Sequence, residues 1–168
     1  MKLFRLILPL IVVVCLVFTS SPAMAAPMAV LPGLKGVFTG TPPTDIGIHK
    51  EQLSNCPTSP NCVSSSASDD EHYIAPLEYA AEQDAIRDQL VAIIKNQPRT
   101  EIIEQTDDYV LVEFTSRLMG FVDDAEFYFL PDGKTVAMRS AARLGESDLG
   151  VNRRRLAQFR LALQSLGA

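Results

Sequence analysis

The sequence predicts an α+β fold in which a four-stranded antiparallel sheet is packed on one face by an N-terminal and a C-terminal helix. Apolar residues recur at helical spacing over 76–95 and again over 150–166. Between these segments, four runs alternate apolar and polar residues, and turn-forming residues separate them. Helix, four strands, helix is the order of an α+β sandwich with both helices on one sheet face.

The N-terminus has the pattern of a secretory signal peptide over residues 1–25. Lys2 and Arg5 precede the apolar run Leu6–Phe18, and the small-residue cleavage pattern Ala23-Met24-Ala25 follows. An apolar run of this length is short for a membrane span. We expect export with the mature chain beginning at Ala26, to the periplasm or the extracellular space, or to the thylakoid lumen in a photosynthetic bacterium.

Export also affects charge. Removing Lys2 and Arg5 reduces the 15 basic residues to 13 against 20 acidic ones, so the formal charge falls from −5 to −7. This balance argues against nucleic acid and anionic membranes as partners. We expect no membrane span after cleavage, with an uncleaved anchor as the alternative. A lipoprotein is less favoured, because no small residue precedes Cys15.

Two cysteines remain in the predicted mature chain, Cys56 and Cys62, with five residues between them. In an oxidising compartment an even count favours a disulfide, and the spacing allows one. A metal site and a redox-active pair are the alternatives, but no clustered histidine supplies further ligands and no basic side chain lies nearby to activate a thiol. We expect a structural bridge, no metal and no cofactor.

The rest of the chain divides into an arm and a domain. Prolines and glycines recur over 26–55, which predicts an irregular arm or linker, and residues 56–168 form the single predicted α+β domain. Its first helix begins at Pro76, runs to about Lys95 and is stopped by Asn96-Gln97-Pro98. The strands are expected at 100–105, 109–116, 124–130 and 135–142, and the last helix at about 150–166.

Alternation assigns the strand faces. The apolar face is expected under the helices and includes Val110, Val112, Phe114, Phe127, Phe129, Val136, Met138, Ser140 and Ala142. A turn at Asp132-Gly133 places Glu126 opposite Arg139 on the other, solvated face. With Asp124 these two residues form a candidate sheet-face site, either a set of solvated ion pairs or a shallow platform for a small anion or a partner.

The segment 143–155 supplies the second candidate site, made of Arg143, Asp148, Asn152 and Arg155. Helical phase puts Asn152 at the centre of the apolar stripe of the last helix, where its amide must find partners. One interpretation is that Asp148 caps the helix and Asn152 ties the preceding loop together. The other is a small polar pocket at the helix start that binds an anion.

We assign no catalytic residue. His49 and His72 have no partner at a spacing typical of a hydrolytic triad. Asp69-Asp70-Glu71 with His72 could hold a divalent cation, but a solvated acidic loop is favoured. Asp123 and Asp124 are neighbours on a strand and therefore point to opposite faces.

Three motifs resemble the family known as domain of unknown function 1499. They are Cys56-Pro57-x-Ser59-Pro60-Asn61-Cys62-Val63-Ser64-Ser65, then Asp123-Asp124-x-Glu126-Phe127, then Arg139-Ser140-Ala141-x-Arg143-x-Gly145-x-x-Asp148-x-Gly150-x-Asn152-x-x-Arg155. The resemblance implies export or membrane attachment in many members, but no reaction, ligand or cofactor.

The expected function is therefore that of an exported, non-catalytic binding or accessory module. Its polar site would lie around the cysteine loop and segment 143–155, and its partner would be a small anion or a protein. The alternative is an enzyme that uses the Arg and Asp residues of that segment on a small anionic substrate.

Overall fold

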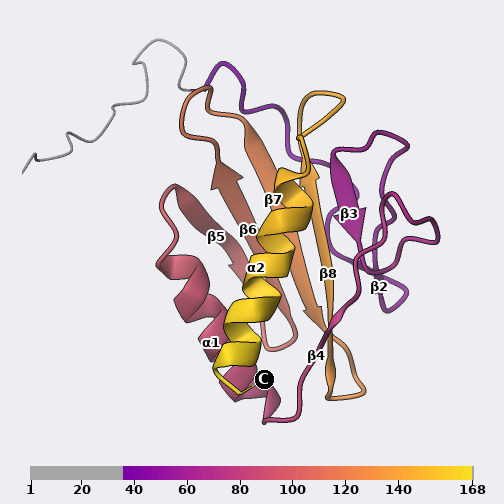
Figure 1. Ribbon diagram of the computed structural model, residues 1–168, viewed down its shortest axis with the longest axis vertical. Coiled ribbons are helices and arrows are strands. Elements are labelled where there is room, and N and C mark those ends of the chain that lie inside the picture. Colours follow the sequence, from indigo (N-terminus) through magenta and orange to yellow (C-terminus); the bar gives the residue numbers. More distant parts are fainter. Residues whose placement is uncertain (1–35, 168) are drawn as a thin grey trace, which may run out of the picture.

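The main sheet has six strands, and two helices pack on one of its faces (Figure 1). A computed structural model describes residues 36–167; the predicted signal peptide and residues 26–35 of the predicted arm lie outside the described residues. The elements are β1 (Ile48–His49), β2 (Gln52–Leu53), β3 (Cys62–Ser64), β4 (Leu77–Glu78), α1 (Gln83–Lys95), β5 (Thr100–Gln105), β6 (Tyr109–Thr115), β7 (Val122–Phe129), β8 (Thr135–Ala142) and α2 (Val151–Ser165).

The four predicted strands form an antiparallel meander from β5 to β8. Glu126 pairs with Arg139 across β7 and β8, which confirms the predicted register. At the outer edge, β5 shifts register against β6 between Ile102 and Glu104.

The prediction of four strands was wrong, because β3 and β4 both add to the free edge of β8. These strands contain three and two residues. Segments this short are held by backbone pairing to a distant strand and carry no alternation that a sequence could show.

The start of the first helix was also predicted too early. Leu77 and Glu78 pair with Val136 and Thr135 of β8, so the chain stays extended there and α1 begins only at Gln83. The end of α1 at Lys95 agrees with the prediction, and α2 agrees within one residue at each end.

The main core lies between the sheet and the helices, as the alternation predicts. Phe159 of α2 packs its ring edge on Phe127 at 5.5 Å between centroids and lies 5.9 Å from Phe114. The buried helix residues include Ile86, Leu90, Ile94, Leu156 and Leu163, and the buried sheet residues include Val110, Val112, Phe129, Val136 and Met138. Burial of these side chains is the main favourable contribution to folding.

The opposite sheet face is covered as well, so the prediction that it is solvated was wrong. The β1–β2 hairpin belongs to the predicted arm and pairs Ile48 with Leu53. Leu53 then packs with Tyr109, Leu111 and Tyr128 in a second apolar cluster. The hairpin buries side chains that helices on one face would have left in water.

The disulfide joins Cys56 and Cys62, with 5.6 Å between the two Cα atoms. Cys62 is also the first residue of β3 and pairs with Ala141 near the end of β8. The bridge therefore shapes a loop at the end of the sheet where β8 turns toward α2.

Candidate functional site

Asn152 lies at the start of α2 and is fully buried, and its side-chain amide both accepts and donates hydrogen bonds. Its Oδ1 accepts hydrogen bonds from Ser140 Oγ and Arg155 Nη1, both at 2.6 Å. Its Nδ2 donates to the backbone oxygen of Asn61 at 3.0 Å. The amide is thus satisfied by three different segments of the chain.

The loop between β8 and α2 is tied at both ends. Asp148 Oδ2 accepts from the backbone N–H of Asn152 at 2.7 Å, and its Oδ1 accepts from Gly150 N at 2.9 Å. On the cysteine loop, Asn61 Nδ2 donates to the backbone oxygen of Gly145 at 2.5 Å. Asp148 and Asn152 thus organise the loop, but the N-cap residue of α2 is Gly150 and not the predicted Asp148. The contact of Asn61 brings the cysteine loop against segment 143–155.

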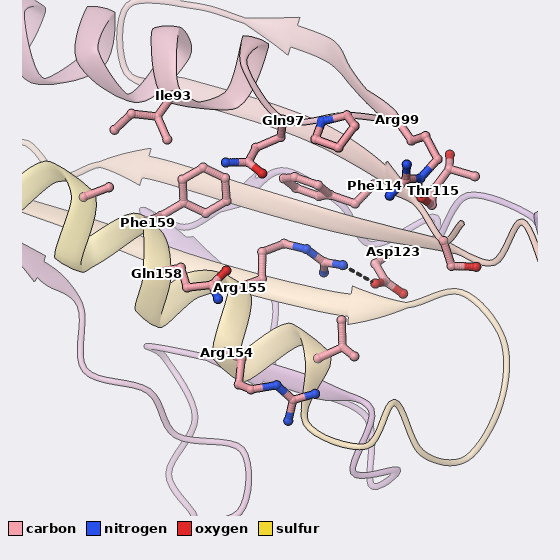
Figure 2. A pocket seen from close by; sticks show the side chains of 14 residues that line it. Ile93, Gln97, Arg99, Phe114, Thr115, Asp123, Arg154, Arg155, Gln158 and Phe159 are labelled. Atoms are coloured by element: carbon pink, nitrogen blue, oxygen red, sulfur yellow. Dashed lines mark hydrogen bonds and ion pairs between the residues drawn. The ribbon is translucent and has the colours of Figure 1, made fainter. Parts of the chain in front are cut away.

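Arg155 continues this network onto the helix face of the sheet. Its Nη2 donates to Asp123 Oδ2 at 2.7 Å, and its guanidinium lies over the Phe114 ring at 4.4 Å from the centroid. Burial raises the pKa of Asp123 above its ordinary value, and the ion pair with Arg155 offsets part of that rise. Figure 2 shows the two side chains pointing toward each other.

Arg143 lies on the opposite face and does not join Arg155. It binds Asp124 through two bonds, from Nε at 2.8 Å and from Nη2 at 2.6 Å, and it also pairs with Glu113. The hydrogen bond to Asp124 is the largest contribution that raises the pKa of Arg143, so the guanidinium stays charged. Asp123 and Asp124 therefore serve opposite faces, as the sequence predicts.

Glu126 and Arg139 form a buried pair under the arm. Arg139 Nη1 donates to Glu126 Oε2 at 2.9 Å, and both side chains are almost fully shielded from solvent. Glu126 Oε1 accepts from Tyr109 Oη and from the backbone N–H of Gly47, each at 2.8 Å. Burial is the main reason that the pKa of Tyr109 is raised, so its hydroxyl keeps the proton that it donates.

A groove with a volume of about 580 Å³ lies between α1 and α2, and the α1–β5 connection, the end of β6 and the start of β7 complete its lining (Figure 2). Its apolar lining includes Ile93, Phe114 and Phe159. Its charged lining consists of three cations, Arg99, Arg154 and Arg155, and one carboxylate, Asp123. We call this cavity the helix groove.

Sequence reasoning found Arg155 but missed the helix groove. The helical phase of Arg155, beside the buried stripe, could have indicated a partly buried cation. No sequence spacing could have predicted that Arg155 pairs with Asp123, because the two residues meet only when α2 packs on β7.

His72 was also missed as a structural residue. Its ring is buried and joins two loops, with Nδ1 2.7 Å from Asp69 Oδ1 and Nε2 3.2 Å from the backbone oxygen of Ser59. Asp69 is therefore engaged by the histidine. Within residues 36–167, no group of three or more His, Cys, Asp and Glu side chains is arranged to hold a metal ion.

Together, residues 36–167 define an α+β domain with a six-stranded main sheet, two helices on one face of it, a two-stranded hairpin on the other, a disulfide loop and a cationic groove. A search among curated proteins found no match, and neither did a search among solved structures. A family model described as protein of unknown function (DUF1499) matches residues 52–163. The chain belongs to this family. None of the helices among the described residues is both long and apolar enough to cross a membrane.

Proposed function

We propose that this protein is an exported, non-catalytic binding module whose binding site is the helix groove. The observation that carries the proposal is the combination of an aromatic floor with an excess of arginines in one cavity. Its volume of about 580 Å³ falls in the range of small-molecule sites.

The lining indicates the ligand chemistry. Arg155 is already occupied by Asp123 and Asn152. Arg99 and Arg154 line the groove, are exposed, and each donate one bond to a backbone oxygen, which leaves further N–H groups of both side chains available to a ligand. A small molecule with an apolar body and one carboxylate or phosphate group would fit such a site.

This proposal relocates the polar site expected from the sequence. Asp148 and Asn152 hold the loop, and Arg143 faces the other side of the sheet. Arg155 is the member of that set that lines the helix groove.

Export is part of the proposal and has two supports. The first 25 residues have the signal pattern, and the Cys56–Cys62 disulfide is typical of oxidising compartments. The periplasm, the extracellular space and, in a photosynthetic bacterium, the thylakoid lumen all satisfy both.

The enzyme alternative uses the Arg and Asp residues of segment 143–155, but Asp148 of that segment accepts bonds from the loop backbone. The carboxylate that lines the groove is Asp123, whose pKa burial raises. A general base must be able to reach its substrate. Asp123 instead accepts a 2.7 Å bond from Arg155. We therefore favour binding over catalysis.

Titration with decanoate tests the proposed site, because this probe has an apolar chain and one carboxylate. We expect chemical-shift changes at groove residues in amide NMR spectra, and weaker changes with the neutral decanol. Ala162→Phe should block binding because Ala162 lines the groove, whereas Ala157→Phe, outside the lining of the same helix, should not. Arg154→Ala should weaken decanoate binding roughly tenfold.

The matched charge control is Arg153→Ala, since Arg153 bonds to backbone oxygens of Glu71 and Tyr73 and does not line the groove. Equal binding of decanoate by Arg154→Ala and Arg153→Ala, or equal binding of decanol and decanoate, would contradict the proposal.

A further inference from the structure

Exposed apolar side chains gather at one end of the molecule. Two loops form this end, 116–121 between β6 and β7 and 143–150 between β8 and α2, together with the first described residues of the chain (Figure 1). Their exposed large apolar residues are Val37, Leu118, Met119, Leu144 and Leu149. We call these five residues the apolar end.

Direct contacts hold the three segments together. The Phe38 ring lies 5.2 Å from that of Phe121 between centroids. Gly40 approaches so closely that a Cβ there would lie 2.8 Å from Arg143 Cβ and 3.0 Å from Leu144 Cγ. The segment that begins at Gly36 therefore packs against both loops.

Leu149 is held outward by its loop. The side chain is 83% exposed, and its backbone has the left-handed φ of +53° that a leucine rarely adopts. Ser147 Oγ accepts from Leu149 N, and Arg154 donates to the Leu149 oxygen. A fixed, strained turn that presents a leucine to water is unfavourable for the isolated protein, which points to a function for that side chain.

Three arginines lie next to these loops, and loop 143–150 also carries the exposed Glu146. Arg117 is exposed within loop 116–121, Arg154 binds the neighbouring loop, and Arg99 bonds to the Thr115 oxygen at the end of β6. Leucines flanked by arginines match the boundary between acyl chains and phosphate headgroups. The net negative charge of the whole chain, which argues against an anionic membrane as a partner, does not describe this local group of arginines.

We infer that the apolar end docks on the surface of a lipid bilayer, with its leucines among the acyl chains and its arginines at the headgroup phosphates. The sequence before Gly36 supports this occupant over a second copy of the chain. No charged residue occurs from Ala26, where the mature chain is expected to begin, to Leu34. The chain thus enters the domain at the apolar end from an apolar segment. This inference goes beyond the proposed ligand site and does not depend on it.

Tryptophan fluorescence tests the inference, because the chain has no tryptophan. Leu118→Trp is the reporter, and Leu161→Trp on α2 is its matched control, since the two leucines are 64% and 65% exposed. Vesicles of phosphatidylcholine and phosphatidylglycerol should shift the emission of Leu118→Trp to shorter wavelength, and lipids with brominated acyl chains should quench it. The control should show neither effect. The reporter tests loop 116–121 itself, whether or not Leu6–Phe18 is present.

A second substitution in the Leu118→Trp background tests the contribution of the neighbouring loop. Leu149→Ser should weaken vesicle binding roughly tenfold, because less apolar surface is buried, while Leu166→Ser at the other end of α2 should leave it unchanged. Equal emission of Leu118→Trp and Leu161→Trp with vesicles would overturn the inference. A blue shift that grows with protein concentration and needs no vesicles would identify a second copy as the occupant and would overturn it too.

Discussion

Asn152 is the residue on which the end of the sheet depends, because its side chain bonds to β8, α2 and the cysteine loop together. Asn152→Leu should leave several of these buried groups unpaired and cost roughly 1–3 kcal/mol of unfolding free energy. Arg154→Ala, on the exposed side of the same helix, should change stability by less than about 0.5 kcal/mol. Urea unfolding of both variants measures the difference, and equal costs would contradict the role given to Asn152.

His72 makes stability depend on pH, because both ring nitrogens face oxygen atoms that accept hydrogen bonds. The doubly protonated ring can donate to Asp69 and to the Ser59 oxygen at once. Burial opposes this charge, but the bonds to Asp69 and Ser59 and the nearby Glu71 outweigh it, so the pKa of His72 is raised. The pKa of Asp69 is lowered, first by the His72 backbone N–H.

The sign of the pH effect follows from these directions. A raised His72 pKa gives stability that is fully present below the ordinary value of about 6.5 and is lost as pH rises through the folded-state pKa. The lowered Asp69 pKa adds stability above about 4 that is lost in acid. Urea unfolding from pH 5 to 8 should therefore show falling stability, and His72→Gln should flatten that fall. His49→Gln is the control, and an unchanged slope in His72→Gln would refute the assignment.

At the scale of elements, the sequence predicts the strands and helices that are long enough to show their own hydrophobic periodicity. The runs that became β5 to β8 alternate over six to eight residues, and a hairpin turn fixes the register of Glu126 with Arg139. By contrast, β3 and β4 exist because β8 offers an open edge, and the Asp123–Arg155 pair exists because α2 packs over β7. Such long-range pairings leave no local pattern in a sequence.

Among the structural elements, the disulfide bond can be removed with the simplest effect on stability. The bridge closes a short loop, so Cys56→Ser with Cys62→Ser should cost about 2 kcal/mol in the unfolding free energy and preserve the fold. Thermal unfolding of the double variant and of the oxidised protein provides the comparison. Thiol labelling of the denatured, unreduced protein should detect no free thiol from this pair; two reactive thiols would show that the bridge is absent in solution.

At the scale of the whole molecule, the sheet is covered on both faces, and one sequence signal of this was overlooked. Tyr109, Leu111 and Tyr128 lie on the face that was expected to be solvated, yet they are large and apolar. An apolar row on a supposedly wet face indicates that something covers it. What covers it, the hairpin that carries Leu53, could not be predicted because its strands contain two residues each.

The proposed export depends on residues 1–25 and has its own test. Cleavage after Ala25 should leave a mature protein that begins at Ala26, because Ala23 and Ala25 occupy the small-residue positions of a cleavage site. Intact mass spectrometry of the exported protein should show the loss of residues 1–25. A full-length species retained in the membrane would show instead that the apolar run acts as an anchor.

The register shift in β5 has a consequence for how copies of this protein behave in concentrated solution. An outermost strand with regular, unpaired backbone groups can recruit strands from neighbouring molecules, and an irregular or charged one does so poorly. β5 interrupts its pairing between Ile102 and Glu104 and exposes Glu101 and Glu104 along that side. The other margin of the sheet ends in strands of two and three residues. Neither edge of the sheet therefore offers a regular strand on which a fibril could grow. The protein can expose leucines at one end and still resist aggregation by edge-to-edge strand pairing.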